Sequence, residues 1–386
     1  MYISILGRQP AISIAELERV YGYVRWFSDI SALIETDATV DIQRLGGSQK
    51  IGKVIAELPN GDWMRASMKI VQHYSKVWAD YEGKITLGIS AYGFKVDTRD
   101  IQKTGLILKG KLKSTTASLR LVPNQEAALS TATSHHNKLG LSDNKVELIV
   151  VRGTKGIIIA ESTGAQNITA LAARDQGRPK RDAFVGMLPP KLAQIMVNLS
   201  GLESGRILDP FCGTGVILQE AGLMHYDVYG TDLAEKMIRY SRENLDWLQE
   251  SHHIKVNYTL NEGDAADTKW QDPIDAVVAE TYLGQPFSAP PSSAKLIEVR
   301  GNCNYIISQF LKNIGTQIKK DTILVLAIPA WKDKEDNFTH LPLAESEPLK
   351  KLGYKRTEFT SVNPEQLLYY RPDQVVAREI LVLTKI

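Results

Sequence analysis

Two short segments carry residue types at a spacing that can do chemistry. The first, Arg206 to Leu218, reads Arg-Ile-Leu-Asp-Pro-Phe-Cys-Gly-Thr-Gly-Val-Ile-Leu, and the second, Val228 to Leu233, reads Val-Tyr-Gly-Thr-Asp-Leu. Together they predict a strand, a glycine turn, a helix and a second strand ending in Asp232. Gly213 and Gly215 let the backbone turn tightly and approach a ligand without a Cβ atom in the way. The pattern predicts a nucleoside site at this turn.

Asp209 separates this site from one for a dinucleotide. A carboxylate beside a helix N-terminus repels a pyrophosphate and attracts a cation. Leu218 stands where the dinucleotide pattern has its third glycine, which argues against nicotinamide and flavin cofactors. S-adenosylmethionine (SAM) has an ammonium, a sulfonium and a ribose whose hydroxyls Asp232 can bind. We therefore predict a SAM site, the alternative being an ordinary tight βα turn.

The predicted cofactor-binding residues lie on this turn and at the ends of the second and third strands. Asp264 follows the third strand, where it can face an adenine amino group or form a solvated acidic turn. The full set is Asp209, Phe211, Cys212, Gly213, Thr214, Gly215, Asp232, Leu233, Asp264 and Ala265.

Length and composition bound the class of protein. The chain has 386 residues, 43% hydrophobic and 23% charged, which predicts a soluble globular protein of two or three domains. Its two cysteines, Cys212 and Cys303, are too few for a disulfide framework. With no signal peptide and no apolar run of about 18 residues, we expect a cytoplasmic protein and no membrane partner. The His135-His136 and His252-His253 pairs point apart and suggest no third ligand, so no metal is expected.

Basic residues gather in one part of a chain whose net charge is only +2. Residues 84–162 contain 12 Lys and Arg against 6 Asp and Glu. A helix predicted over 101–112 carries Lys103, Lys109 and Lys111 on one face, with Lys113 just beyond it. This face is either solvated or a contact for a polyanion.

The order of the predicted elements indicates the fold class. In the first half, Ser13 to Glu16 reads as a capping box before a helix that ends near Tyr21. Strands alternate with helices after Leu192, near residues 207, 228, 254–258, 274–279 and 322–328. Two further strands, 356–359 and 379–383, have no convincing helix between them. This order predicts an α/β, mostly parallel, doubly wound sheet with a final hairpin.

Three segments of the chain, one of which contains the glycine turn, resemble a known protein family. They are Leu6 to Pro10 with Ala15 to Glu18, the connection with Arg174-Asp175, Arg178-Pro179 and Gly186 to Ala193, and Asp209 to Gly215. Together they resemble the THUMP-domain tRNA methyltransferases, in particular the group that makes N2-methylguanosine at position 10 in archaea and eukaryotes. The resemblance covers nearly the whole chain, although the glycine turn is typical of methyltransferases in general.

The resemblance implies a domain order and a partner. It implies a ferredoxin-like domain over 1–80, a THUMP RNA-binding domain over 81–165, a linker over 166–190 and a Rossmann-like class I methyltransferase domain over 191–386. The partner would be tRNA, and some relatives need a small activating subunit. The residues expected to contact RNA are Lys103, Lys109, Lys111, Lys113, Arg174, Arg178, Lys180 and Arg181.

One segment departs from the pattern that the resemblance implies. Amino-methyltransferases of this type carry Asp-Pro-Pro-Tyr after the fourth strand, whereas this chain has Glu280-Thr281-Tyr282-Leu283-Gly284. Glu280 can still accept an N–H bond from a guanine amine, and Tyr282 or Phe287 can stack on the base, so we take Glu280, Tyr282 and Phe287 as catalytic candidates. The alternatives are another RNA position, DNA or protein as methyl acceptor, or an RNA-binding protein that no longer turns over.

Overall fold

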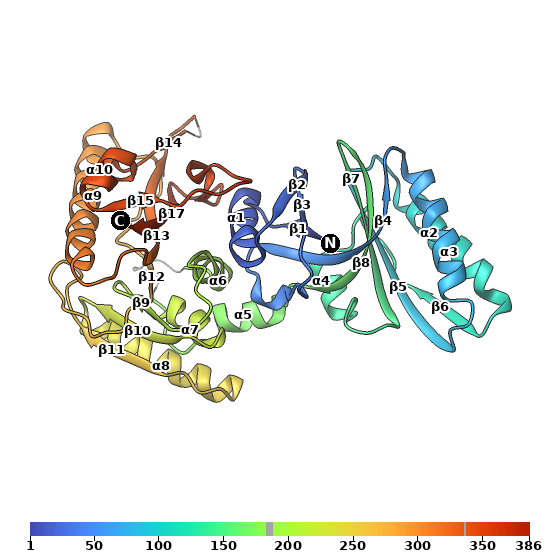
Figure 1. The fold of residues 1–386 in the computed structure, drawn as a ribbon, viewed down its shortest axis with the longest axis horizontal. Helices are drawn as coiled ribbons and strands as arrows, with labels where there is room; N and C mark the ends of the chain where they lie inside the picture. The colour runs from blue at the N-terminus through green and yellow to red at the C-terminus, as the bar shows by residue number, and fades with distance from the viewer. Residues whose placement is uncertain (183–187, 336) are drawn as a thin grey trace. The chain divides into compact units, whose positions relative to one another are not determined.

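The computed structural model describes residues 1–182, 188–335 and 337–386 of the chain. These residues form two units, of which the first comprises Met1–Leu17 and Tyr21–Ala170 and the second Glu18–Val20 and Leu171–Ile386 (Figure 1). Gly186 and Met187 of the connection quoted above lie outside the described residues. Within the described ranges, no helix is both long and apolar enough to cross a membrane.

The first unit is built on an eight-stranded sheet of order β2-β3-β1-β4-β8-β7-β5-β6. Strand β5 pairs in parallel with β6 and β7, and the other neighbours are antiparallel. The strands are β1 (Tyr2–Leu6), β2 (Val24–Ser28), β3 (Ser31–Ile34), β4 (Ser48–Leu58), β5 (Gly83–Tyr92), β6 (Ala117–Leu121), β7 (Lys145–Gly153) and β8 (Gly156–Ala165).

Helices α1 (Pro10–Tyr21), α2 (Trp63–Val77), α3 (Thr98–Lys111) and α4 (Thr131–His136) complete the first unit. Helices α2 and α3 pack through Ile70, Tyr74 and Leu108 on apolar side chains of β5, β7 and β8. Asp62 caps α2, because its side chain accepts a hydrogen bond from Arg65 N at 3.1 Å.

The capping box predicted at Ser13 to Glu16 is wrong. Helix α1 already begins at Pro10, a residue suited to the first turn because it has no N–H to satisfy there. The Glu16 carboxylate is fully buried and accepts hydrogen bonds from Gly46 N at 2.9 Å and Gly47 N at 2.8 Å. Glu16 therefore fixes a distant turn instead of the start of its own helix.

The segments 1–80 and 81–165 share one sheet. Strand β4 belongs to the first segment and pairs along its length with β8 of the second. The assignment of these segments to ferredoxin-like and THUMP domains stays a prediction.

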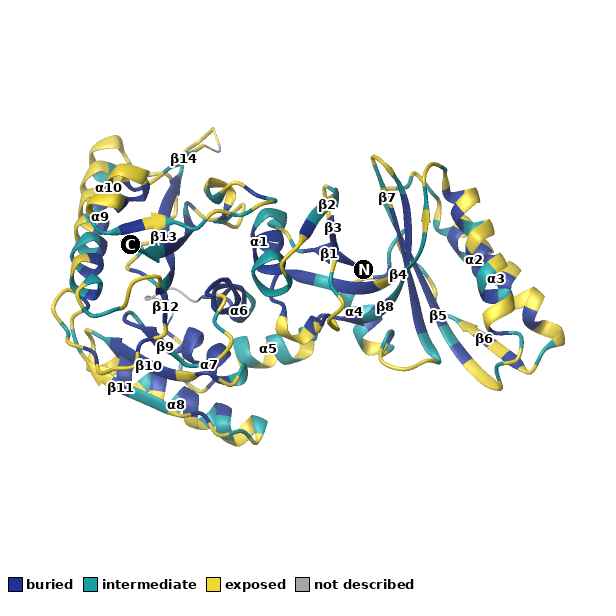
Figure 2. Ribbon diagram, in the orientation of Figure 1, coloured by how far each residue is buried: buried dark blue, intermediate teal, exposed yellow. Residues whose placement is uncertain are grey.

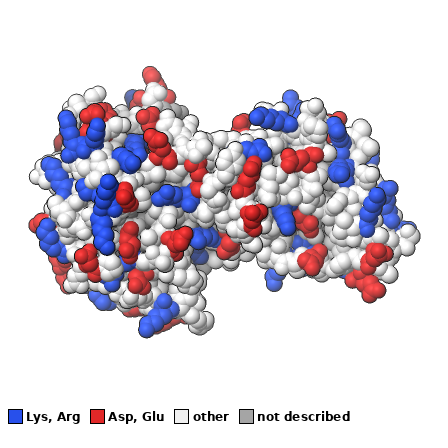
Figure 3. Space-filling model, in the orientation of Figure 1, with Lys and Arg blue, Asp and Glu red and all other residues white. Residues whose placement is uncertain are grey.

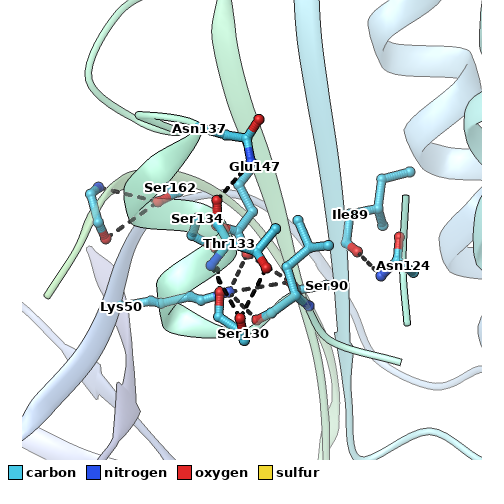
Figure 4. A network of polar contacts seen from close by, with 12 residues as sticks. Lys50, Ile89, Ser90, Asn124, Ser130, Thr133, Ser134, Asn137, Glu147 and Ser162 are labelled. Carbon is cyan, nitrogen blue, oxygen red and sulfur yellow. Dashed lines mark hydrogen bonds and ion pairs between the residues drawn. The ribbon is translucent and has the colours of Figure 1, made fainter. Parts of the chain in front are cut away.

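A buried ion pair joins the same two segments (Figure 4). Lys50 of β4 contacts the Glu147 carboxylate of β7, and the two side chains are 1% and 0% exposed. Lys50 Nζ also donates to Leu129 O at 2.7 Å, and Ser90 Oγ donates to Glu147 Oε1 at 2.6 Å. The carboxylate thus has two donors in a place that water does not reach.

The second unit contains a sheet of order β11-β10-β9-β12-β13-β17-β15, with β14 beside β13 and β16 beside β17. Strands β11, β10, β9, β12 and β13 are parallel, and β17 runs antiparallel between β13 and β15. The bounds are β9 (Arg206–Asp209), β10 (Asp227–Asp232), β11 (Tyr258–Glu262), β12 (Ala276–Glu280), β13 (Ile323–Lys332), β14 (Phe338–Thr339), β15 (Tyr354–Arg356), β16 (Leu368–Tyr369) and β17 (Val376–Lys385).

Helices alternate with most of these strands, as predicted, although the described residues between β11 and β12 form no helix. The helices are α5 (Ile168–Gln176), α6 (Pro190–Leu199), α7 (Val216–Leu223), α8 (Glu235–His252), α9 (Ser293–Gly315) and α10 (Ser346–Lys351). Figure 2 shows buried and exposed stretches along α9. Cys303, Ile307 and Phe310 of this helix are fully buried against the apolar strand residues of one sheet face. The predicted doubly wound α/β fold of this half and its final antiparallel strands are confirmed.

The third strand of this sheet lies later in the chain than predicted. We expected 254–258, whereas α8 continues to His252 and β11 begins at Tyr258. His253, with φ of 52°, ends the helix in the left-handed conformation. Val256 is buried although it lies in a loop, which explains why its segment resembles a strand in the sequence.

The Lys50–Glu147 pair yields a prediction for stability. In Lys50→Met the Glu147 carboxylate stays buried without its cation, so the free energy of unfolding should fall by about 3–5 kcal/mol. Urea unfolding followed by circular dichroism measures this change. The double variant Lys50→Met/Glu147→Leu is the control and should lose less, because no charge is left behind. A double variant as unstable as the single one would contradict the argument.

Candidate active site

A cavity of about 710 Å³ opens at the C-terminal edge of the second sheet. It lies where β9 separates β10 from β12, the point at which the strand order reverses and at which open α/β sheets bind ligands. The lining consists of Asp182, Leu188, Asp209, Pro210, Phe211, Cys212, Gly213, Thr214, Val216, Ile217, Asp232, Leu233, Ala234, Lys236, Met237, Gly263, Asp264, Ala265, Glu280, Thr281, Tyr282, Leu283, Gly284 and Ile306.

The glycine turn forms one wall of this cavity. Gly213 and Gly215 have φ of 49° and 79°, values that side chains disfavour. Gly215 precedes α7 and does not line the cavity; a Cβ atom there would lie 2.9 Å from Ser241 Oγ. The structure therefore gives Gly215 a role in the shape of the turn. Of the ten residues predicted to bind the cofactor, the other nine line the cavity.

Side chains of α8 hold the turn in place. Ser241 Oγ donates to Gly213 O at 2.8 Å, and Asn244 Nδ2 donates to Thr214 O at 2.8 Å. Asn244 also exchanges two hydrogen bonds with the backbone of Lys180, at 2.9 and 3.0 Å. The connection that precedes α6 is thereby tied to the same turn.

Asp232 links the turn to the end of β10. Its Oδ2 accepts a hydrogen bond from Gly213 N at 2.9 Å, and its Oδ1 accepts one from Ala234 N at 2.9 Å. Each carboxylate oxygen has a second acceptor site, so the residue can still bind ligand hydroxyls. Asp232 is a structural part of the turn as well as a lining residue.

Carboxylates dominate the charge of the cavity wall. Five acidic residues line it, Asp182, Asp209, Asp232, Asp264 and Glu280, against one basic residue, Lys236. Lys236 Nζ is itself paired with Asp182 at 2.7 Å. The wall is therefore complementary to a cation and unfavourable for a pyrophosphate.

Burial makes these charges costly. Asp209 is 2% exposed, and burial raises its pKa well above the usual range, although a hydrogen bond from Phe211 N at 3.1 Å opposes the rise. The charges of Asp232 and Glu280 raise the pKa of Asp209 further. Burial also raises the pKa of Asp232, against the hydrogen bonds from Ala234 N and Gly213 N. A bound cation would stabilise both ionised forms.

Glu280 and Tyr282 both line the cavity. Glu280 ends β12 and forms an ion pair with Arg378 of β17. Tyr282 is 46% exposed at the rim. Phe287 does not line the cavity and packs on the apolar cluster around α9. The structure brings two of the three catalytic candidates together and leaves Phe287 outside.

The residues predicted to bind RNA fall into two groups. Lys103, Lys109 and Lys111 of α3, together with Lys113, are exposed, and Figure 3 shows basic side chains along the α2 and α3 part of the first unit. In the connection, Lys180 contacts Glu243 at 3.1 Å, and Arg181 Nη1 donates to Gln176 at 3.1 Å.

Two arginines of the connection have structural partners. Arg174 forms two hydrogen bonds with the buried Glu220 carboxylate, at 2.7 and 3.0 Å. Arg178 is 3% exposed, and its nearest acidic oxygen, on Asp175, lies at 3.9 Å. These positions suit packing within the second unit, so the contact of Arg174 and Arg178 with RNA stays a prediction.

Sequence reasoning missed several residues of the site. Asp182 and Lys236 line the cavity, and Arg378 pairs with Glu280. The sequence of β17 could have indicated Arg378, because it is a cation that precedes the apolar run Ile380 to Leu383, but nothing local identifies its partner. No group of three or more metal-binding side chains occurs in the described ranges.

The parallel sheet with its antiparallel β17, the glycine turn and the acid-lined cavity define a class I, SAM-dependent type of methyltransferase fold. A model of the family described as "RMKL-like, methyltransferase domain" matches residues 178–304. The crystal structure of TrmN from Thermus thermophilus is similar over 100% of this chain and 99% of that one, with a TM-score of 0.53 and 14% identity. This similarity extends the shared fold to both units.

Two curated relatives identify the family more narrowly. A protein of Methanothermobacter thermautotrophicus named "tRNA (guanine(10)-N2)-dimethyltransferase" is 36% identical over 165 residues, 42% of this chain and 45% of that protein. One of Methanothermococcus thermolithotrophicus, named "Probable tRNA (guanine(10)-N2)-dimethyltransferase", is 34% identical over 141 residues, 36% of this chain and 78% of that protein. The chain belongs to the family of these proteins, although the first match spans less than half of that relative's length.

The buried Asp209 carboxylate gives a prediction for pH. Its pKa in the folded protein lies above the unfolded value of about 3.9, so stability that is present below that pH is lost as the pH rises through the folded value. Asp209→Asn removes the ionisation, and an amide oxygen can still accept from Phe211 N. The stability of Asp209→Asn relative to the wild type should therefore increase with pH.

Urea unfolding of the ligand-free protein between about pH 5 and pH 8 measures this difference. Asp267→Asn, at an exposed turn, is the control and should show no such trend. A constant difference between Asp209→Asn and the wild type over this range would contradict the burial argument.

Proposed function

We propose that this protein transfers a methyl group from SAM to the N2 amine of a guanosine in tRNA. The observation that carries the proposal is one cavity that joins a cation-selective wall to a carboxylate, Glu280, at the end of β12. Membership of the family described above supports the choice of substrate.

The cofactor would lie across the ends of β9 and β10. Asp232 would accept hydrogen bonds from the ribose hydroxyls, and Asp209 would face the cationic end of the molecule. Leu233, 69% exposed at the mouth, and Ala265 would flank the adenine, with Asp264 near its amino group. SAM supplies an electrophilic methyl group when it is bound there.

Glu280 would act on the amine of the target base. The lone pair of guanine N2 is delocalised into the ring, so acceptors must hold its protons before the nitrogen can attack. The Oε2 atom of Glu280 accepts no hydrogen bond within the described part of the chain and is available for this contact. As the N–C bond forms and the methyl–sulfur bond breaks, the nitrogen releases a proton that Glu280 can take. Tyr282 would stack on the base.

A basic cluster that includes Lys236 of the cavity lining supports an RNA substrate. Lys180, Lys236 and Arg239 lie 5.4, 5.2 and 6.0 Å from the ring of Tyr240, all on or beside α8. Such a cluster suits phosphates, with an aromatic face beside them. With the lysines of α3, it would grip tRNA by its shape, in the cytoplasm where tRNA is found. An activating subunit, as some relatives use, would be a further partner.

The loop after Glu280 favours a second candidate, a different methyl acceptor. Compared with Asp-Pro-Pro-Tyr, this chain reads Glu280-Thr281-Tyr282-Leu283. Both prolines are absent, and a leucine takes the position of the final tyrosine. Another RNA atom, DNA or protein would then receive the methyl group from the same cavity. A protein that binds RNA without turnover is the remaining alternative, and cofactor binding separates it from both.

Binding of SAM should depend on Asp232. Loss of a charged acceptor is worth about 1.5–3 kcal/mol, so Asp232→Asn should weaken SAM roughly 10- to 100-fold. Isothermal titration calorimetry measures this affinity. Asp227→Asn, at the exposed start of the same strand, should bind like the wild type. A wild-type protein that releases no heat with SAM would contradict the proposal and favour the protein without turnover.

The reaction itself is tested with the purified full chain, labelled SAM and unmodified tRNA transcripts. Nucleoside mass spectrometry should show N2-methylguanosine, and Glu280→Gln should lower kcat by about 10²- to 10⁴-fold. Glu262→Gln, which changes the exposed carboxylate at the end of β11, should leave the rate unchanged. Label at another nucleoside, or in DNA or protein alone, would exclude the N2 amine of tRNA guanosine.

A further inference from the structure

Glu280 reaches the cavity as one half of an ion pair whose other half lies two strands away. Its Oε1 contacts Nε of Arg378 in β17, and the two side chains are 16% and 10% exposed. Arg378 is 8% exposed as a residue and does not itself line the cavity. The pair is therefore largely shielded from water, which strengthens the attraction between its charges.

The strand register explains how the two side chains meet. Glu280 pairs with Ala327 of β13, and Pro329 of β13 pairs with Arg378 of β17. Paired residues, and residues two apart on a strand, share a face of the sheet. All four side chains are therefore on one face, and the short Ala327 leaves room for arginine to reach across β13.

The loop beyond Glu280 is also held from β13. Thr281 N donates to Ala327 O at 3.0 Å, and Thr281 Oγ1 donates to the same oxygen at 3.1 Å. A proline at this position would supply neither donor. Hydrogen bonds and an ion pair thus fix a loop that lacks the two prolines of the Asp-Pro-Pro-Tyr pattern.

We infer that Arg378 is a positioning residue, which holds Glu280 by one oxygen so that the other faces the target amine. The inference rests on the proposed role of Glu280. Glutamate has one more rotatable bond than aspartate, and an unheld carboxylate would sample several rotamers. The charges of Asp209 and Glu280 repel each other, and the cavity wall that Glu280 shares also holds Asp182, Asp232, Lys236 and Asp264. The ion pair with Arg378 offsets repulsion at Glu280.

The test uses Arg378→Gln and Arg378→Lys with labelled SAM and the tRNA transcripts. Arg378→Gln should lower kcat by roughly 100-fold, since a misplaced group costs that much, with SAM affinity within about twofold of the wild type. Arg378→Lys should restore part of the rate.

Two further variants separate positioning from folding. In a Glu280→Gln background, Arg378→Gln should cause little additional loss, because the group it positions is gone. Arg356→Gln is the matched control: Arg356 pairs with Glu379 at 2.6 Å, and Glu379 neighbours Arg378 on the opposite face of β17. It should lower stability without a comparable loss of kcat.

The possible results are distinct. An Arg378→Gln protein with wild-type kcat overturns the inference, as does an equal loss of kcat in the Glu280→Gln background. If Glu280→Gln methylates tRNA at the wild-type rate, the role given to Glu280 fails, and this inference fails with it. If the wild type makes no product, the proposed function itself fails.

Discussion

Repulsion between one buried carboxylate, Asp209, and two partly buried ones, Asp232 and Glu280, acts at the cavity edge of the second unit. Asp209, Asp232 and Glu280 end three neighbouring strands of one parallel sheet, so the fold itself places them together. Backbone N–H groups of the glycine turn offset part of this cost for Asp209 and Asp232, and a guanidinium offsets it for Glu280. The shape of the turn therefore affects the charge of the ligand that can bind. The backbone N–H groups of the turn donate hydrogen bonds to the carboxylates whose negative charge favours a cationic ligand.

Local patterns predicted the parts of this site that are close in sequence. The glycine turn, Asp232 and Glu280 each follow a strand directly, and parallel strands bring such ends to one edge. Alternation of strand and helix was enough to predict the α/β class of the second unit. Each of these features depends on residues that lie within one turn or one strand of each other. Over that range, the spacing of residues along the chain predicts the local structure.

The remaining parts depend on contacts between distant segments. Arg378 lies nearly 100 positions after Glu280, and only the register of β12, β13 and β17 shows that they share a face. Glu16 reads as a helix cap, yet it serves a turn 30 positions away. Phe287 has an aromatic ring that could stack on a base, but this ring packs against the apolar cluster around α9. Side-chain type alone does not decide between a core and a site.

The Lys50–Glu147 pair limits how the two segments of the first unit can be exchanged with those of other proteins. A fully buried lysine or glutamate without its partner would be an isolated charge in an apolar interior. Exchange of only one of the two segments would therefore be costly unless the remaining charge were replaced by an apolar residue as well. Natural shuffling of this half with other enzymes should exchange the entire eight-stranded sheet at once.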